Sequence, residues 1–371
     1  MAMNRRDFLK GVAGWSAGAV LLSSCSKIVF ESETDESHPG HSPNRFSFVH
    51  ITDQHIERKR SGDKGYRKCI ESIKAENPKP HFAVMGGDMP FDGNYNPKEK
   101  FIDEIHLYRD ITNELGIPYF HCMGNHDVLG WHPRRKVSAD DPDLGKKCIM
   151  DLLEWPSSYY SFDYKGWHFV VLDCIKGIID QEKGPTHIIE IDEEQMDWLG
   201  SDLGKNHGKP VVAFTHVAAF CNIGQINADP EQKAMDGSMV IRNSKALRLM
   251  LERHKVKALV QGHSHDIQEF FYNGVWYVTS AAAGAAWWSG SWLGFDPGYT
   301  IFTCDGDKLT WEHKTFQWDP ILEPEDNLER EKTKERNDFL MEQENLMKRE
   351  ILKGKTLEPR PVPTLHVRLE S

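Results

Sequence analysis

The sequence predicts an α/β protein in which two mixed β-sheets face each other with helices on the outside. The first observation is that short apolar runs alternate with longer segments of helical periodicity. The second is that this alternation occurs in both halves of the chain, on either side of an irregular segment. The third is that polar residues gather where the apolar runs end, and the carboxyl ends of strands are where α/β sheets bind ligands.

The first half of the predicted domain has the order β-α-β-α-β and begins at Arg45. Its second helix should stop at Gly116, because glycine commonly follows the last helical turn. We expect strands at 45–53, 81–88 and 117–127, and helices at 63–76 and 97–116. The segment 130–156, rich in proline and charge, should be an irregular insertion.

The second half opens with a hairpin that turns at Lys165 and Gly166. A second hairpin has an Asn-Gly turn, which is the strongest short-range signal for that motif. We expect, in chain order, a hairpin at 159–174, a helix at 192–203, a strand at 209–216, a helix at 243–254, a strand at 256–265, a hairpin at 268–280, and strands at 299–304 and 308–311.

Both ends of the chain differ in composition from this domain. Residues 4–10 resemble a twin-arginine export motif, and the apolar run 11–22 is too short to span a bilayer. Leu22 to Cys25 then resembles a lipobox, so we expect an exported envelope lipoprotein, periplasmic or surface-facing, held to the membrane by lipidated Cys25; a plain anchor helix is the alternative. The predicted organisation is a signal peptide at 1–24, a lipidated tether at 25–44, the domain at 45–316, and a charged helix and tail at 317–371.

The charge of the chain limits its partners. The formal net charge is −11, and removal of residues 1–24, which carry +2, would make it −13. A surface this acidic repels polyanions, which argues against long nucleic acid as a substrate. We expect a small or lipid-like substrate instead. The six cysteines beyond Cys25 form no Cys-x-x-Cys pair, and we expect them to be buried thiols without disulfides.

Five strand-like runs end in residues that can bind metal. The motifs are Asp53-x-His55, Gly86-Gly87-Asp88, Gly124-Asn125-His126-Asp127, His216 and Gly262-His263-Ser264-His265. A set of imidazoles, carboxylates and an amide oxygen suits Mn, Fe or Zn better than Ca or Mg, and the lack of thiolates argues against a structural zinc site.

In this order, the five motifs resemble those of the calcineurin-like metallophosphoesterase superfamily, over residues 46–311. The resemblance implies a sandwich of two sheets, two divalent or trivalent metal ions, and hydrolysis of a phosphoric ester by a water that both metals activate. Asp53, His55, Asp88 and His265 would hold one metal, and Asp88, Asn125, His216 and His263 the other. Asp88 would then bridge the two.

His126 is not a metal ligand in the families that this sequence resembles. The resemblance implies that it faces the leaving group and stabilises or protonates it. Asp127 and Asp92 are both candidates to orient its ring. Trp287, Trp288, Trp292 and Tyr299 follow the last metal motif closely and either line a substrate pocket or pack in the core.

Two departures from the motifs of known subfamilies narrow the choice of subfamily. Purple acid phosphatases carry a tyrosine three positions after the bridging aspartate, where this chain has Phe91, and 89–93 lacks the Asp-Arg-Gly of Ser/Thr protein phosphatases. A phosphodiesterase and a phosphomonoesterase both remain open, with substrate choice placed in the insertions 130–156 and 218–240. The alternative from another class is a non-catalytic, metal-stabilised binding lipoprotein.

Overall fold

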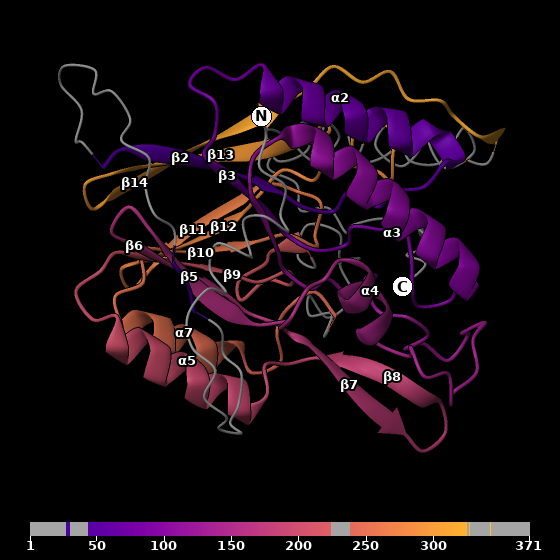
Figure 1. The fold of residues 1–371 in the computed structure, drawn as a ribbon, viewed down its shortest axis with the longest axis horizontal. Helices are drawn as coiled ribbons and strands as arrows, with labels where there is room; N and C mark the ends of the chain where they lie inside the picture. The colour runs from indigo at the N-terminus through magenta and orange to yellow at the C-terminus, as the bar shows by residue number, and fades with distance from the viewer. Residues whose placement is uncertain (1–26, 30–43, 224–237, 325, 327–341, 343–371) are drawn as a thin grey trace, which may run out of the picture.

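The computed structural model describes residues 27–29, 44–223, 238–324, 326 and 342. Two β-sheets lie against each other, and the helices lie on their outer sides (Figure 1). The predicted fold class is therefore confirmed. The predicted signal peptide and most of the C-terminal helix and tail lie outside the described residues. None of the helices in the described part of the chain combines the length and the apolar character that crossing a bilayer requires.

The smaller sheet has five strands in the order β14-β13-β2-β3-β4. Its strands are β2 (Phe46–Ile51), β3 (Phe82–Met85), β4 (Tyr119–His121), β13 (Gly298–Asp305) and β14 (Lys308–Thr315). The first three run parallel, and β13 pairs antiparallel with β2. Helices α2 (Gly62–Lys74) and α3 (Lys98–Thr112) cover the outer face, followed by the short helix η2 (Asn113–Leu115).

The larger sheet has seven strands in the order β1-β5-β6-β9-β10-β12-β11. Its strands are β1 (Lys27–Val29), β5 (Tyr160–Tyr164), β6 (Trp167–Val171), β9 (Val211–Phe214), β10 (Ala258–Gln261), β11 (Gln268–Tyr272) and β12 (Val275–Thr279). Helices α5 (Glu193–Lys205) and α7 (Ser244–Arg253) lie outside it (Figure 1). Asp192 caps α5, because its side chain accepts a hydrogen bond from the backbone of Gln195.

An aromatic core joins the two sheets. Phe48 of β2 stacks between Phe82 and Phe302, with ring centroids 5.2 and 5.0 Å away. Phe169 and Phe214 of the larger sheet meet the same ring edge-on at 5.5 and 5.8 Å. All five side chains are buried. This packing holds the two sheets against each other.

Four elements depart from the expected layout. Helix α4 (Lys147–Leu152) lies in the segment predicted to be irregular. Strands β7 (Ile175–Asp180) and β8 (Gly184–Ile189) form a separate two-stranded sheet that the sequence analysis missed. This hairpin lies outside both large sheets and leaves Ile179 77% exposed, so apolar and polar residues do not alternate along its sequence as they do in a half-buried strand. Strand β1 lies within the predicted tether and pairs with β5.

Candidate metal centre

The strand ends bring six of the seven predicted metal ligands into two compact groups. The loops after β2 and β3 come from the smaller sheet, and those after β9 and β10 come from the larger one. One group is Asp53, His55 and His265, and the other is Asp88, His216 and His263. In each group the potential ligand atoms all lie within 4.8 Å of one another. Each matches the partition that the family resemblance implies.

Asp88 lies between the two groups. Its Oδ2 atom is 3.1 Å from Nε2 of His216 and 3.6 Å from Nε2 of His55. Asp53 has a similar intermediate position, since its Oδ1 atom is 3.2 Å from Nε2 of His265 and 3.9 Å from Nε2 of His216. Asp88 is thus placed as a bridging ligand would be.

Most of these side chains extend from backbone in the left-handed region. The φ angles are 55° for Asp53, 40° for His55, 55° for Asp88, 73° for His263 and 58° for His265. Residues other than glycine rarely adopt this conformation, which costs roughly 1–3 kcal/mol at each position. Strain concentrated at one end of the sheets indicates that these loops are shaped for a ligand rather than for stability.

The ligand histidines are oriented by backbone carbonyls. Nδ1 of His216 donates to the carbonyl oxygen of Gly86 over 2.8 Å, and Nδ1 of His55 donates to that of Phe91 over 3.2 Å. Nδ1 of His265 donates to the carbonyl of Ala285. A carbonyl can only accept, so each ring carries its proton on Nδ1 when neutral and presents the Nε2 lone pair to the centre.

This arrangement fits bound cations. Nε2 of His55 and Nε2 of His265 are only 3.2 Å apart, and in neutral rings both atoms carry lone pairs. Two facing lone pairs repel unless a cation lies between them. The amide oxygen of Asn125, the seventh predicted ligand, is buried and has no hydrogen-bond partner among the described residues. A buried orphan acceptor is costly unless a ligand satisfies it.

Asp127 holds two of the metal-bearing loops together. Its carboxylate accepts hydrogen bonds from the backbone nitrogens of Asp88, Met89 and Gly124 over 3.0, 2.8 and 2.7 Å. Gly124 approaches so closely that an added Cβ would lie 2.2 Å from atoms of Asp88. Burial, together with the nearby carboxylate of Asp88, raises the pKa of Asp127 to about 7. Asp127 therefore acts on loop geometry, whereas the sequence analysis considered it only as one of two candidates to orient His126.

Asp92, rather than Asp127, lies beside the His126 ring. Nδ1 of His126 is 3.5 Å from Oδ1 of Asp92, and the backbone nitrogen of His126 donates to Oδ1 of Asp88 over 2.8 Å. The His126 and His55 rings are 5.0 Å apart. Burial disfavours the charged form of His126, but Asp88 and Asp92 outweigh it and raise its pKa to about 9.

The pKa values at the centre are shifted by burial and by the carboxylates that lie there. Burial lowers the pKa of His55 to about 3 and that of His263 to about 4. For His216, burial again opposes the charge, yet Asp88 and Asp53 raise its pKa to about 10. Burial disfavours the carboxylate of Asp88, but His216 and His126 hold its pKa well below the usual range. Such a site attracts cations.

The tryptophans that follow the last motif divide between core and centre. Trp288 and Tyr299 are buried, and Tyr299 hydrogen-bonds to Ser72 and Glu76. Trp287 is only partly buried, and its ring lies 4.6 Å from that of His265. The sequence analysis also missed Thr52, whose hydroxyl donates to Asp53 over 2.7 Å. Nothing in the spacing of the motifs marks a neighbour of this kind.

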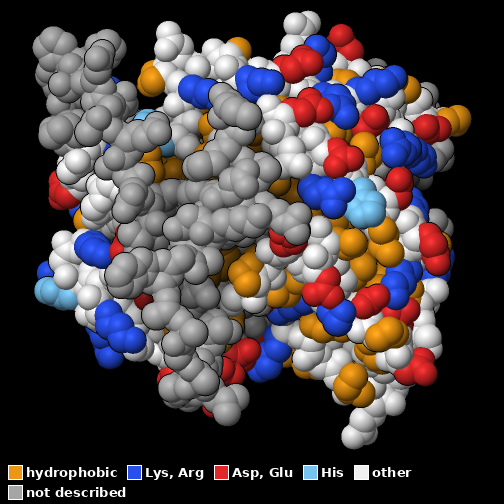
Figure 2. Space-filling model, in the orientation of Figure 1, with side chains coloured by type: hydrophobic (Ala, Val, Ile, Leu, Met, Phe, Trp, Pro, Cys, Tyr) orange, Lys and Arg blue, Asp and Glu red, His pale blue; other side chains and the backbone are white. Residues whose placement is uncertain are grey.

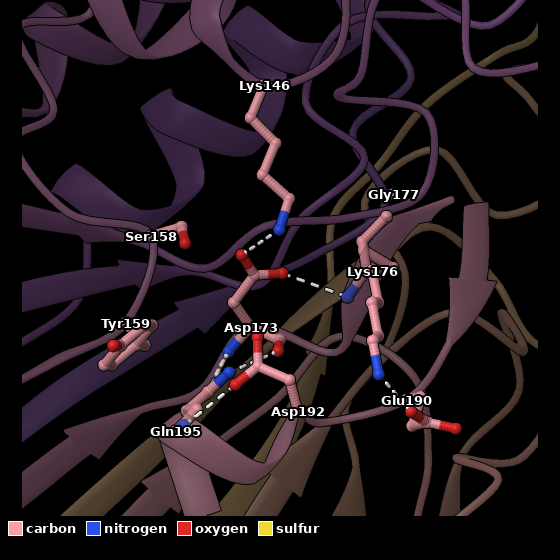
Figure 3. A pocket seen from close by; sticks show the side chains of 10 residues that line it. Lys146, Ser158, Tyr159, Asp173, Lys176, Gly177, Glu190, Asp192 and Gln195 are labelled. Carbon is pink, nitrogen blue, oxygen red and sulfur yellow. Dashed lines mark hydrogen bonds and ion pairs between the residues drawn. The ribbon is translucent and has the colours of Figure 1, made fainter. Parts of the chain in front are cut away.

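A separate cavity of about 300 Å³ lies beside the segment that joins the end of β6 to the start of β7 (Figure 3). None of the predicted metal ligands lines it. Its charged groups pair with one another, Lys146 with Asp173 and Lys176 with Glu190.

All six cysteines in the described residues are free thiols, and five of them are buried.

Comparison with known proteins agrees with this geometry. The family model for calcineurin-like phosphoesterases matches residues 46–266, which is more than half of the chain. The chain belongs to the calcineurin-like phosphoesterase family. With two groups of buried ligands at the expected strand ends, it is a metal-dependent phosphoesterase with a dinuclear centre.

Among curated proteins, the chain is 23% identical over 227 residues to a probable cyclic nucleotide phosphodiesterase of Synechococcus, covering 58% of this chain and 75% of that protein. It is 26% identical to the Ser/Thr-protein phosphatase CPPED1 of Bos taurus, covering 69% and 74%. A probable glycerophosphodiester phosphodiesterase, GpdQ of Arcobacter nitrofigilis, is 24% identical, covering 63% and 77%. Among solved structures, a dimetal phosphatase from Danio rerio shares the fold, with a TM-score of 0.51 and 14% identity over 73% of this chain and 99% of that one.

Proposed function

We propose that this protein hydrolyses small phosphodiesters at the dinuclear centre. The observation that carries the proposal is the pair of buried ligand groups with Asp88 between them and His126 at their edge. In this proposal Asp53, His55, Asp88 and His265 hold one cation, and Asp88, Asn125, His216 and His263 hold the other. Cations bound there supply an activated water and a positive clamp for the phosphoryl oxygens.

The residues of the chain then orient the ester and move the proton. Because Nδ1 of His126 faces Asp92, Nε2 is the ring atom left to give a proton to the departing oxygen. Asp92 holds the ring in that orientation. Imidazole, carboxylate and amide donors together favour Mn, Fe or Zn as the bound ions.

The charges around the centre favour a diester over a monoester. In the described residues, the side-chain hydrogen bonds and ion pairs of the predicted ligands and of His126 involve no lysine or arginine. A phosphodiester carries one negative charge, whereas a monoester carries up to two and needs more positive charge around it. The names of the Synechococcus and Arcobacter relatives, both phosphodiesterases, support the same choice.

A substrate screen tests the proposal. Protein loaded with Mn, Zn, Fe or Ni is assayed on bis-p-nitrophenyl phosphate and on p-nitrophenyl phosphate. We expect the higher kcat/KM on the diester. A higher kcat/KM on the monoester would make the protein a phosphomonoesterase. Loaded protein that hydrolyses neither ester would favour the rival function, a non-catalytic binding lipoprotein stabilised by metal.

The proposal also covers where the protein acts and on what. Residues 1–26 lie outside the described residues, so export and lipidation of Cys25 remain predictions. Cys25→Ala should leave the protein soluble in the envelope fraction or uncleaved, whereas unchanged membrane association with an intact leader would favour an anchor helix. On the face that Figure 2 shows, the described basic and acidic side chains are interspersed, which supports a small substrate over long nucleic acid.

A further inference from the structure

Trp287 lies on a loop that is tightly attached to the metal centre. The backbone nitrogens of Ala283 and Gly284 donate to the carbonyl oxygens of Thr52 and Asp53 over 2.9 and 3.0 Å. The carbonyl of Ala285 accepts from Nδ1 of His265. The loop therefore shares hydrogen bonds with both strands that supply the first group of ligands, and its position is fixed relative to them.

Trp288 anchors this loop in the core. Its side chain is fully buried, and its Nε1 donates to the carbonyl oxygen of Gln54 over 2.8 Å. It packs against α2 so closely that a Cβ added at Gly65 would lie 2.4 Å from the indole. With Trp288 directed inward, the neighbouring Trp287 is left partly exposed beside the ligands.

The Trp287 ring contacts two predicted ligands of one metal. Its centroid lies 4.6 Å from the ring of His265 and 5.8 Å from that of His55. Trp292 stands nearly perpendicular to it, at 84° and 5.3 Å, and is held by a hydrogen bond from its Nε1 to the carbonyl oxygen of Ser264. The two indoles form an aromatic corner beside the centre.

The corner is held at a cost in backbone strain. Ala285, Trp287 and Trp288 have φ angles of 40°, 48° and 68°, and bulky residues seldom adopt such values. Strain of this kind persists where the surrounding structure imposes it, and it gathers at ligand-binding sites. Packing alone gives no reason to keep a large, partly exposed aromatic residue in this conformation.

We propose that Trp287 and Trp292 form a subsite for a planar aromatic substituent of the phosphoester. A flat ring can lie face-on against one indole and edge-on against the other, which are the two arrangements that aromatic pairs prefer. We assign the aromatic group to the substituent that stays on phosphorus, since the ring contacts of Trp287 in the described residues are with His55, His265 and Trp292 and not with His126, the proposed proton donor to the departing oxygen. This inference rests on the proposed phosphodiesterase function.

The test compares three esters with the same leaving group. The substrates are p-nitrophenyl phenylphosphonate, the cyclohexyl analogue, which has similar bulk without the flat ring, and the methyl analogue. Trp287→Ala should lower kcat/KM on the phenyl ester by roughly 3- to 10-fold and change the other two by less than about twofold, because only the flat ring gains stacking energy. Trp287→Phe should restore most of the loss. Metal content is measured on each sample.

Trp276→Ala is the matched control, since Trp276 is 36% exposed on β12 and contacts Phe271 and Trp311 rather than the centre. It should leave all three values unchanged. Equal losses on all three esters would overturn the subsite as proposed, because they would place the shared p-nitrophenyl group, rather than the phenyl substituent, at Trp287. Loss of metal in Trp287→Ala would make Trp287 a support for His265. p-Nitrophenyl phosphorylcholine serves as a fourth substrate, and a loss confined to it would make the corner a site for quaternary ammonium groups, which also contradicts the proposal.

An inhibition measurement on the wild-type protein tests the subsite without relying on a variant that could fail to fold. Phenylphosphonate should inhibit the wild type more tightly than methylphosphonate, by roughly 3- to 10-fold. Equal inhibition constants would overturn the subsite alone. Absence of activity on every ester in the wild type would instead refute the proposed function, so the two failures are distinguishable.

Discussion

The aromatic core between the sheets and the metal centre at their ends follow opposite rules. In the core, Phe48, Phe169 and their neighbours are buried, apolar and paired in regular strands. At the centre, five predicted ligands have positive φ angles, and carboxylates and imidazoles are buried together. The core stabilises the fold, whereas the centre lowers the stability of the fold because it buries ionisable side chains that serve the site. The two regions should therefore respond differently to substitution.

Asp88→Asn should show the largest difference between the metal centre and the aromatic core. The change keeps the shape of the side chain but removes the charge that lies between both ligand groups. We expect loss of bound metal and a fall in kcat/KM on the order of 10⁴-fold or more. Elemental analysis and turnover on a diester measure both effects.

Asp151→Asn is the control for this variant, because Asp151 is 63% exposed and, within the described part of the chain, forms its ion pair with Lys147. It should keep metal and turnover. Retention of about two equivalents of metal by Asp88→Asn would refute the bridging role.

His126→Gln should lower turnover without removing metal. If Nε2 gives a proton to the departing oxygen, the loss should be on the order of 10²–10⁴-fold for an alkyl leaving group. It should be smaller for p-nitrophenolate, which leaves readily without a proton. The measurement is kcat/KM on one activated and one unactivated diester, with metal content on the same samples. The exposed His207 provides the control substitution, His207→Gln.

Each unfavourable result for His126 has a distinct meaning. Equal losses on both esters would assign His126 to electrostatic stabilisation of the phosphoryl group. Full activity on the unactivated ester would remove it from the mechanism. Loss of metal would make it a ligand.

The sequence predicted the centre better than its surroundings, and the reason is local. Asp53, Asp88 and His216 each follow a short apolar run, so their placement at the carboxyl ends of strands follows from strand direction. The choice between Asp92 and Asp127 as partner of His126 depends on how two loops fold over each other. No spacing encodes that fold.

Prediction of the fold from the sequence also succeeded only where a local pattern marks an element. Strands such as β2 and β10 are buried along their whole length, and their apolar runs mark them. The β7–β8 hairpin lies outside both large sheets, and its apolar residues are spaced without the alternation that would mark a strand. The left-handed φ angles at the ligands were also hidden, because aspartate and histidine give no signal like that of glycine.

Asp127→Asn tests whether Asp127 supports the metal centre or only the stability of the fold. The amide cannot accept hydrogen bonds with both of its ends, so at least one of the three backbone nitrogens that Asp127 binds would lose its partner. Metal affinity should fall by roughly 10–100-fold, as for other residues that support ligands. The free energy of unfolding should fall by about 1–3 kcal/mol.

Asp180→Asn is matched to this change, since Asp180 accepts from the backbone nitrogens of Glu182 and Lys183 in an exposed turn. It should alter neither quantity appreciably. A fall in stability with unchanged metal affinity would place Asp127 with the core rather than with the centre.

Phe169→Leu should have the smallest effect on turnover, although it lies in the middle of the molecule. Phe169 contacts the rings of Phe48, Phe82 and Phe162 at 5.5, 5.3 and 5.0 Å, so a smaller side chain leaves a gap between the sheets. We expect a loss of about 1–2 kcal/mol in the free energy of unfolding, below the ~3–5 kcal/mol typical of Phe→Ala. Phe271→Leu, at a site that is 60% exposed, should cost less than about 0.5 kcal/mol. Metal content and kcat/KM of folded Phe169→Leu should stay within about twofold of wild type, because the loops are held by their own hydrogen bonds. A large fall in metal affinity would show instead that the core sets the geometry of the centre, and the two regions would then be one.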